Sequence, residues 1–265
     1  MKTIKRSFLF CMLTCLMILV IPTSARAASS SLTTLKNNKT YSSYDVTRDG
    51  KKDKIKIVQT KSYATSGTTA RKVYVNGKYR FTAEGCKGCT IYVFRSGTKS
   101  VILSEFIYGD GGRSFSAYQY SGGKFKKKTL GPNTLFYTKA KRSGSYLKLV
   151  SVPKHPGWTL SFCNYTQMPF EVVDTYKMSN GLLVKTSTYA SVTGKTSYYA
   201  KSTFTTGKTP ASVGQKNGPT VKAGSKVTLK SFYYRKSDHC YYYKISVGGK
   251  TGWFKDSASI QFRSA

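Results

Sequence analysis

The stretch V-Y-V-N-G-K-Y-R-F, residues 73–81, decides the fold class. β-Branched and aromatic residues alternate on both sides of Asn76-Gly77, a dipeptide that favours the two positive backbone angles of a tight hairpin turn. The same pattern recurs in residues 117–125, 176–184 and 244–254, around Gly122-Gly123, Asn180-Gly181 and Gly248-Gly249. The sequence therefore predicts an all-β protein built from antiparallel strands.

Alternation within single strands supports this class. In Lys54-Ile55-Lys56-Ile57, successive residues point to opposite faces of a strand, so Lys is expected outside and Ile inside. No segment after the N-terminal region shows a long helical period. The frequent Tyr, Phe, Val and Ile residues supply enough material for a folded core.

Residues 1–27 have the features of a secretory signal peptide. A basic start with Lys2, Lys5 and Arg6 precedes an apolar run over residues 8–21 and the small-residue triplet Ala25-Arg26-Ala27. Cleavage after Ala27 is expected to leave a secreted chain, and no later run approaches the ~20 apolar residues of a membrane span.

The charge balance is strongly positive. The chain carries 44 Lys and Arg against 10 Asp and Glu, and removing the four cations of residues 1–27 lowers the formal charge from +34 to +30. Such an excess disfavours self-association and attracts polyanions, with an attraction that salt screens. At the outer surface of a Gram-positive type of cell, the polyanions available as partners include teichoic acid, acidic polysaccharide, phospholipid headgroups and DNA.

Composition divides the chain into two parts. Residues 28–204 are β-rich, residues 205–220 are rich in Gly, Pro, Thr and Ser and are expected to form a linker or long loop, and residues 221–265 follow as a second unit that starts at 221 or near 205.

The second unit resembles the bacterial SH3-like (SH3b) family. It carries Val221-Lys222-Ala223-Gly224, then Tyr243-Lys244-Ile245, then Gly249-Lys250-Thr251-Gly252-Trp253. The resemblance implies a small β-barrel that contacts the cell wall. Trp253 is expected in the core or at the rim of this barrel, with a ligand platform as the alternative.

An Asp-rich loop opens the first unit. Its candidate oxygen ligands stand at alternating positions around Gly50, the arrangement that hard cations prefer: the side chains of Asp45, Thr47, Asp49 and Asp53 and the carbonyl of Lys51. This D-x-T-x-D-G-x-x-D loop, which leads straight into a strand, resembles the calcium loops of FG-GAP and VCBS-type β-repeats, although Arg48 and Thr47 depart from their pattern. The resemblance implies a structural calcium ion. The alternative is an Asp-rich turn whose side chains cap backbone amides.

Four cysteines follow the signal segment and are disulfide candidates: Cys86, Cys89, Cys163 and Cys240. Three pairings are open, among them closure of Cys86 on Cys89 with Cys163 tethered to Cys240. A redox pair and a zinc site are weaker alternatives, because Cys86-Lys87-Gly88-Cys89 runs into a strand pattern and no second close pair is present.

No catalytic centre is expected. Neither His155 nor His239 lies in a known nucleophile motif, and the adjacent residues Asp238-His239-Cys240 would point to alternate faces of a strand. Glu105 and Asp110 flank a conceivable glycosidase site that also has the features of a surface turn.

One further segment combines cations and aromatic rings. Such side chains can bind phosphate chains and stack on sugars or bases. The alternative is that the lysines protect an edge strand from pairing with other sheets. The residues are Tyr118, Tyr120, Lys124, Lys126, Lys127 and Lys128.

These features together predict a secreted, non-catalytic protein of the cell envelope that binds teichoic acid or peptidoglycan. An extracellular nucleic-acid-binding protein and a cell-wall hydrolase with an unrecognised site are the alternatives.

Overall fold

The computed structural model describes residues 29–61, 69–109, 112–131, 135–153, 170–194, 196–257 and 259–265. The signal-peptide segment, Asp110, His155 and Cys163 lie outside these ranges, so the predictions made for them are not addressed by the structure.

The described chain is all-β and antiparallel, which confirms the predicted fold class. The strands are β1 (Ser31–Leu35), β2 (Thr40–Tyr44), β3 (Asp53–Lys61), β4 (Thr69–Val75), β5 (Lys78–Gly85), β6 (Gly88–Ser96), β7 (Lys99–Ile107), β8 (Arg113–Ser121), β9 (Lys124–Leu130), β10 (Leu135–Ser143), β11 (Tyr146–Pro153), β12 (Phe170–Ser179), β13 (Leu182–Lys185), β14 (Ala190–Gly194), β15 (Ser197–Ala200), β16 (Phe204–Thr205), β17 (Thr220–Val221), β18 (Lys226–Arg235), β19 (Cys240–Val247), β20 (Lys250–Lys255) and β21 (Phe262–Ser264). A single short 3-10 helix among the described residues, η1, covers Pro210–Gln215.

The hairpins predicted from Gly and Asn are present. β4 and β5, β8 and β9, β12 and β13, and β19 and β20 pair as antiparallel neighbours. Both residues of each connecting dipeptide have positive φ, for example 54° at Asn76 and 77° at Gly77. These angles give the turn a twist that matches the flanking strands.

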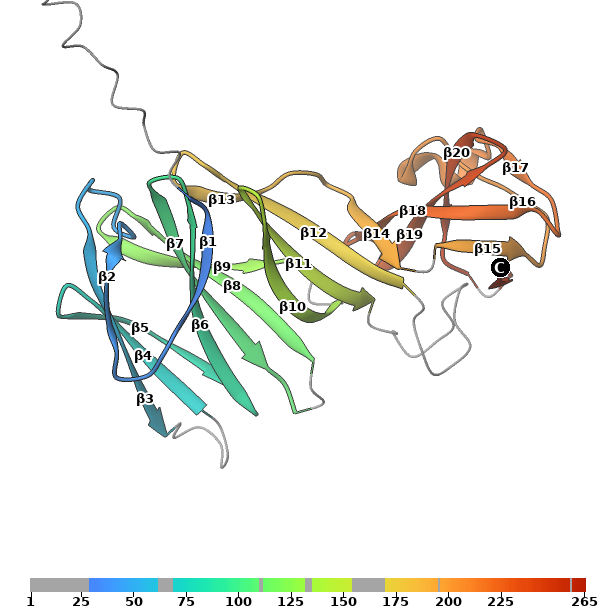
Figure 1. The fold of residues 1–265 in the computed structure, drawn as a ribbon. Helices are drawn as coiled ribbons and strands as arrows, with labels where there is room; N and C mark the ends of the chain where they lie inside the picture. Colours follow the sequence, from blue (N-terminus) through green and yellow to red (C-terminus); the bar gives the residue numbers. More distant parts are fainter. Residues whose placement is uncertain are drawn as a thin grey trace, which may run out of the picture.

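Two sheets form the first lobe, which consists of β1 to β13 (Figure 1). The small sheet has the order β2-β3-β4-β5 and packs on one face of β1, β6, β7 and β8 in the large sheet. Ile55 and Ile57 are buried between the sheets whereas Lys54 and Lys56 are exposed, as the alternation predicted.

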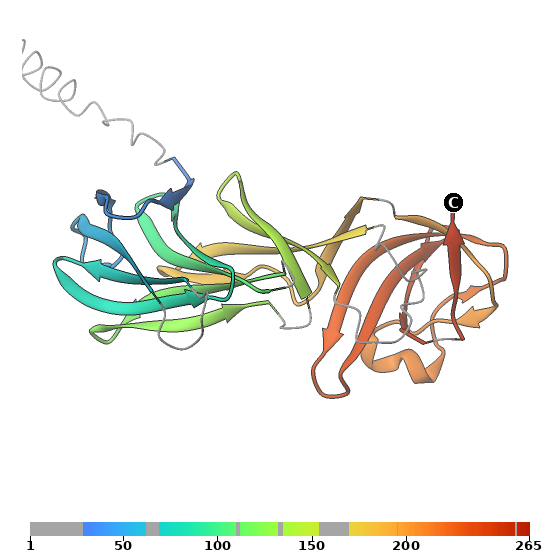
Figure 2. The ribbon, with the colours of Figure 1, turned by 90° about the horizontal axis from the view of Figure 1, so that it is seen from below.

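The large sheet continues without a break into the second lobe, which consists of β14 to β21. Its path runs β1-β6-β7-β8-β10-β11-β12-β14-β18-β15-β21, with β9, β13, β19 and β20 attached at its sides. A second buried cluster extends from Phe94 and Phe115 in the first lobe to Phe232 and Phe254 in the second. Figure 2 shows the layered first lobe beside the curved strands of the second. The two lobes therefore share a sheet and a core.

The segment expected as a linker or long loop lies against the second lobe. β16 pairs with β17, Gly207 exchanges backbone hydrogen bonds with Trp253, and Thr206 is fully buried. A side chain on Gly252 would collide with Thr206, because an added Cβ would lie 2.0 Å from the Thr206 hydroxyl oxygen. Glycine at this position allows the segment to close over β20.

Candidate functional site

The Asp-rich loop is organised around Asp53, at the start of β3. Asp53 is fully buried, and its carboxylate accepts hydrogen bonds from the amides of Val46 (2.7 Å) and Thr47 (2.8 Å). It also accepts from the Thr47 hydroxyl (2.9 Å) and from the side-chain amide of Asn76 (2.6 Å). These neutral donors replace the water that a buried carboxylate loses.

The other two carboxylates of the loop cap its exposed turn. Asp45 accepts from the amides of Arg48 (2.6 Å) and Gly50 (3.0 Å), and Asp49 accepts from the amide of Lys51 (2.8 Å). Among the described residues, no three His, Cys, Asp or Glu side chains form a group able to hold a metal. Asp53 does not fit as a calcium ligand in this arrangement, because both of its carboxylate oxygens already accept hydrogen bonds. Calcium binding at Asp45, Thr47, Asp49 and Lys51 stays a prediction.

Arg48 anchors the loop to the large sheet, a role that the sequence did not reveal. It has a positive φ of 65°, and its guanidinium donates to the carbonyl oxygens of Tyr120 (3.1 Å) and Asn180 (2.6 Å). These partners lie 72 and 132 residues away. Gly181 makes room for this contact, because an added Cβ would lie 2.3 Å from the arginine Nε.

The lysine-rich run forms β9, which pairs only with β8 among the described strands and is therefore an edge strand. Lys124, Lys126, Lys127 and Lys128 are all exposed. The register divides them between two faces, since Lys127 pairs with Tyr118 whereas Lys126 pairs with Gln119. Tyr118 itself is buried and stacks on Phe81 with ring centroids 3.6 Å apart, and Tyr120 packs edge-on against Phe125.

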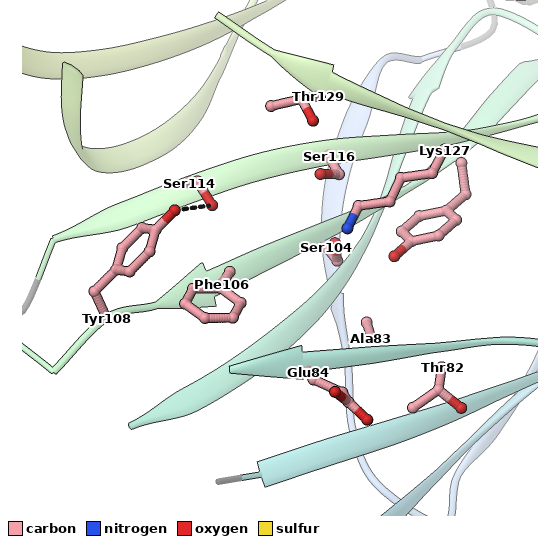
Figure 3. A pocket seen from close by; sticks show the side chains of 11 residues that line it. Thr82, Ala83, Glu84, Ser104, Phe106, Tyr108, Ser114, Ser116, Lys127 and Thr129 are labelled. Carbon is pink, nitrogen blue, oxygen red and sulfur yellow. Dashed lines mark hydrogen bonds between the residues drawn. The ribbon is translucent and has the colours of Figure 1, made fainter. Parts of the chain in front are cut away.

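Lys127 and Tyr118 lie in a cleft of about 400 Å³ between β5 and the strands β7, β8 and β9 (Figure 3). The residues that line it are Thr82, Ala83, Glu84, Ser104, Phe106, Tyr108, Ser114, Ser116, Tyr118, Lys127 and Thr129. Phe106 and Tyr108 stand together at one end with ring centroids 4.6 Å apart, and the Lys127 side chain extends towards Ser104. Burial raises the pKa of Tyr118, so its phenol stays protonated and able to donate a hydrogen bond.

The outward face of the small sheet carries a second, cationic hollow of about 470 Å³. Lys54, Lys56 and Tyr74 line it together with Thr40, Val58 and Gly77. Tyr74 packs edge-on against Tyr79, which is 54% exposed. We call this surface, defined by Lys54, Lys56, Tyr74 and Tyr79, the outer cationic face.

In the second lobe, Trp253 is buried and packs against Tyr189, with ring centroids 4.6 Å apart. Trp253 therefore lies beneath Tyr189, which is 38% exposed and also contacts Tyr233. The sequence analysis named Trp253 but missed Tyr189. Tyr189 lies in the loop before β14, where no sequence motif marks it as a functional residue.

A charged cluster lies at the turn between β18 and β19. The Asp238 carboxylate accepts hydrogen bonds from Arg235 and from the Tyr242 hydroxyl, both at 2.6 Å, and lies 3.7 Å from the Lys255 ammonium. The hydrogen bond from Arg235, aided by that from Tyr242, lowers the pKa of Asp238 well below its usual range. The Arg235 guanidinium lies 4.5 Å from the centre of the Tyr242 ring.

The described cysteines are not paired. Cys86 is exposed, Cys89 is buried, Cys240 is half-buried, and each is a free thiol in the structure. Closure of Cys86 on Cys89, one of the three pairings that the sequence leaves open, is not formed in the structure. Cys86 is exposed at the tight reversal between β5 and β6, whereas Cys89 packs in the core. Burial raises the pKa of Cys89 from 9.0 to about 12, which keeps this thiol protonated and unreactive.

The acids considered for catalysis have structural partners. Glu105 is buried between Arg113 (2.5 Å) and the Tyr92 hydroxyl (2.7 Å). His239 contacts the Tyr234 hydroxyl at 3.0 Å, while the neighbouring Asp238 binds Arg235. Adjacent side chains of the Asp238-His239-Cys240 segment therefore contact different partners.

No protein-family model, curated protein or solved structure matches the chain. No helix in the part of the chain that the structure describes has the length and apolar character needed to cross a membrane.

Proposed function

We propose that this is a secreted, non-catalytic protein that binds anionic polymer of the cell envelope, such as teichoic acid. The observation that carries the proposal is the outer cationic face, where Lys54 and Lys56 flank the hollow beside Tyr74. Lysines next to an aromatic ring suit a chain of phosphates separated by polyol or sugar units, because each part of the repeat finds a partner.

The placement of the acids supports the same function. Glu105, Asp174 and Asp238 are each held by a neighbouring cation, and Asp53 is held by amides inside the loop. Three of these negative charges are therefore compensated by a cation within the fold, and the fourth is buried away from the surface. The exposed lysines therefore determine the positive electrostatic potential at the surface that attracts an anionic polymer.

We also infer that the second lobe is an SH3-like barrel that adds a contact with the wall, and that the Asp-rich loop is of the FG-GAP type. The Gly248-Gly249 hairpin, the closely packed Gly252 and the buried Trp253 support the barrel assignment.

Sedimentation with purified walls, before and after extraction of teichoic acid, tests the proposal. Binding should fall on extraction and should weaken steeply as salt increases. Replacing Lys54 and Lys56 by Gln should lower the slope of log affinity against log salt by about one for each lysine. A matched control replaces Lys222 and Lys226, which are exposed in the second lobe, and should change the slope less.

Two results would contradict the proposal. One is wall binding that survives extraction unchanged, which would assign the ligand to peptidoglycan. The other is duplex DNA binding as tight as teichoic acid binding at the same salt concentration, which would favour the nucleic-acid alternative.

A further inference from the structure

The cleft between β5 and β7–β9 is lined by serine hydroxyl groups and aromatic rings, whereas lysines line the outer cationic face. Ser104 and Phe106 on β7 and Tyr108 just after it line the cleft, and so do the alternate residues Ser114, Ser116 and Tyr118 of β8. Ser104 pairs with Ser116 across the two strands and Phe106 pairs with Ser114. Hydroxyl groups and aromatic rings therefore occupy adjacent positions on one continuous surface.

These serines stand where a β-sandwich normally places large apolar side chains. Further along the same face, Ile91, Val93 and Ile102 fill the space against the small sheet. Ser104 and Ser116 are 6% and 7% exposed, so they are buried in place of such residues. Small polar residues at core positions forgo the stability that filled volume would give, and they leave a space with hydrogen-bonding walls.

The charges at this site favour a neutral ligand. Lys127 and Glu84 both line the cleft, from β9 and β5 respectively. Within the described residues, neither side chain forms a hydrogen bond or an ion pair. A lysine and a carboxylate together leave the site without net charge. A ligand rich in hydroxyl groups can hydrogen-bond to both side chains, whereas the carboxylate would repel a polyanion.

We propose that this cleft is a saccharide-binding site that takes one or two pyranose rings of a neutral oligosaccharide. Phe106 and Tyr108 offer ring faces to the C–H groups of a sugar. Ser104, Ser116, Lys127 and Glu84 supply donors and acceptors for its hydroxyl groups. A volume of about 400 Å³ lies within the range of small-ligand sites. The site is separate from the outer cationic face and does not depend on the function proposed for that face.

Calorimetric titration with two neutral tetrasaccharides, one of N-acetylhexosamine and one of plain hexose, tests the site. In about 1 M NaCl the Debye length shrinks to about 3 Å, so polymer binding at the lysine surfaces is suppressed while saccharide binding should persist. The comparison of the two sugars shows whether the N-acetyl group contributes. At least one of them should bind the intact protein.

Three variants locate the binding. Ser116→Val fills the cleft with a residue suited to a strand and should abolish binding, Phe106→Ala should weaken it about tenfold through the lost ring contact, and Lys127→Met should weaken it through a lost donor. Lys126→Met is the matched control, because Lys126 lies on the same exposed strand but pairs with Gln119 on the opposite face. It should leave saccharide affinity unchanged.

Specific results would overturn the proposal. Absence of binding for both tetrasaccharides in the intact protein would do so, as would equal affinities of the Lys126→Met and Lys127→Met variants. Thermal melts show whether Ser116→Val and Phe106→Ala remain folded. If they do not, Lys127→Met still tests the site, because Lys127 is exposed and its replacement should not disturb folding. Loss of teichoic acid binding with retained saccharide binding would refute only the function of the outer cationic face.

Discussion

Asp53 in the first lobe and Asp238 in the second show two ways in which a strongly cationic protein stabilises a carboxylate. Asp53 is fully buried and held by backbone and side-chain amides and a threonine hydroxyl, whereas Asp238 is partly exposed and held by Arg235, Lys255 and Tyr242. Although Arg48 lies in the same loop as Asp53, it donates to the carbonyl oxygens of Tyr120 and Asn180. Local geometry rather than the number of nearby cations therefore decides which groups stabilise each carboxylate.

The largest expected effect follows from removing the buried carboxylate. Asp53→Ala leaves the amides of Val46 and Thr47 and the side chain of Asn76 without their acceptor. The bond from Val46 is buried and those from Thr47 and Asn76 are partly buried. An unsatisfied buried donor costs about 1–3 kcal/mol and partly buried ones cost less, so we expect a total loss of about 3 kcal/mol in the free energy of unfolding. Urea denaturation measures this loss, which should be insensitive to salt because the donors are neutral.

Asp49→Ala is the matched control for this change. Asp49 is exposed and accepts one hydrogen bond, from the amide of Lys51. Its removal should cost less than about 1 kcal/mol. Equal costs for Asp49→Ala and Asp53→Ala would show that burial of the hydrogen bonds does not distinguish the two sites.

A smaller effect, sensitive to pH and salt, is expected at Asp238. The hydrogen bond from Arg235 lowers the pKa of Asp238 in the folded state, so the folded protein binds the proton less readily than the unfolded chain. The resulting stability is present above the unfolded pKa of about 4 and is lost as the pH falls through the folded value. Melting curves between neutral and acid pH should show a steeper acid loss for the parent protein than for Asp238→Asn. An identical acid loss in both proteins would remove Asp238 from the explanation, and added salt should reduce the difference.

The smallest expected effect concerns calcium at the exposed half of the Asp-rich loop. With an affinity in the roughly millimolar range of extracellular modules, about 2 mM calcium should raise the melting temperature by only a few degrees. Asp49→Ala should remove that rise, while a chelator should not affect the calcium-free protein. Indifference of the parent protein to calcium would assign all three carboxylates of the loop to capping alone.

Local features of the fold were predictable because their causes are local. Asn76-Gly77 and Gly248-Gly249 specify positive backbone angles wherever they occur, and the alternation of Lys54, Ile55, Lys56 and Ile57 assigns each side chain to a face without reference to the rest of the chain. Hairpins and buried faces therefore followed from short stretches of sequence.

Features that depend on distant pairing were not predictable in this way. The cleft arises because β5, β7, β8 and β9 meet, and no local pattern indicates that Ser104 and Ser116 will face Ala83. The partners of Arg48 are fixed by two hairpin tips that lie far along the chain. Residues 205–220 have the composition of a linker, but the burial of Thr206 and its contact with Gly252 hold this segment on β20.

The pairing of β18 with both β14 and β15 limits where the second lobe can be cut from the rest of the chain. β14 also pairs with β12, and β15 also pairs with β21. A gene fragment that begins at residue 205 or 221 would encode β18 without either neighbour and would expose the strand edge that they cover. A fragment that keeps this edge covered would have to begin no later than Ala190, well before the Gly- and Pro-rich segment.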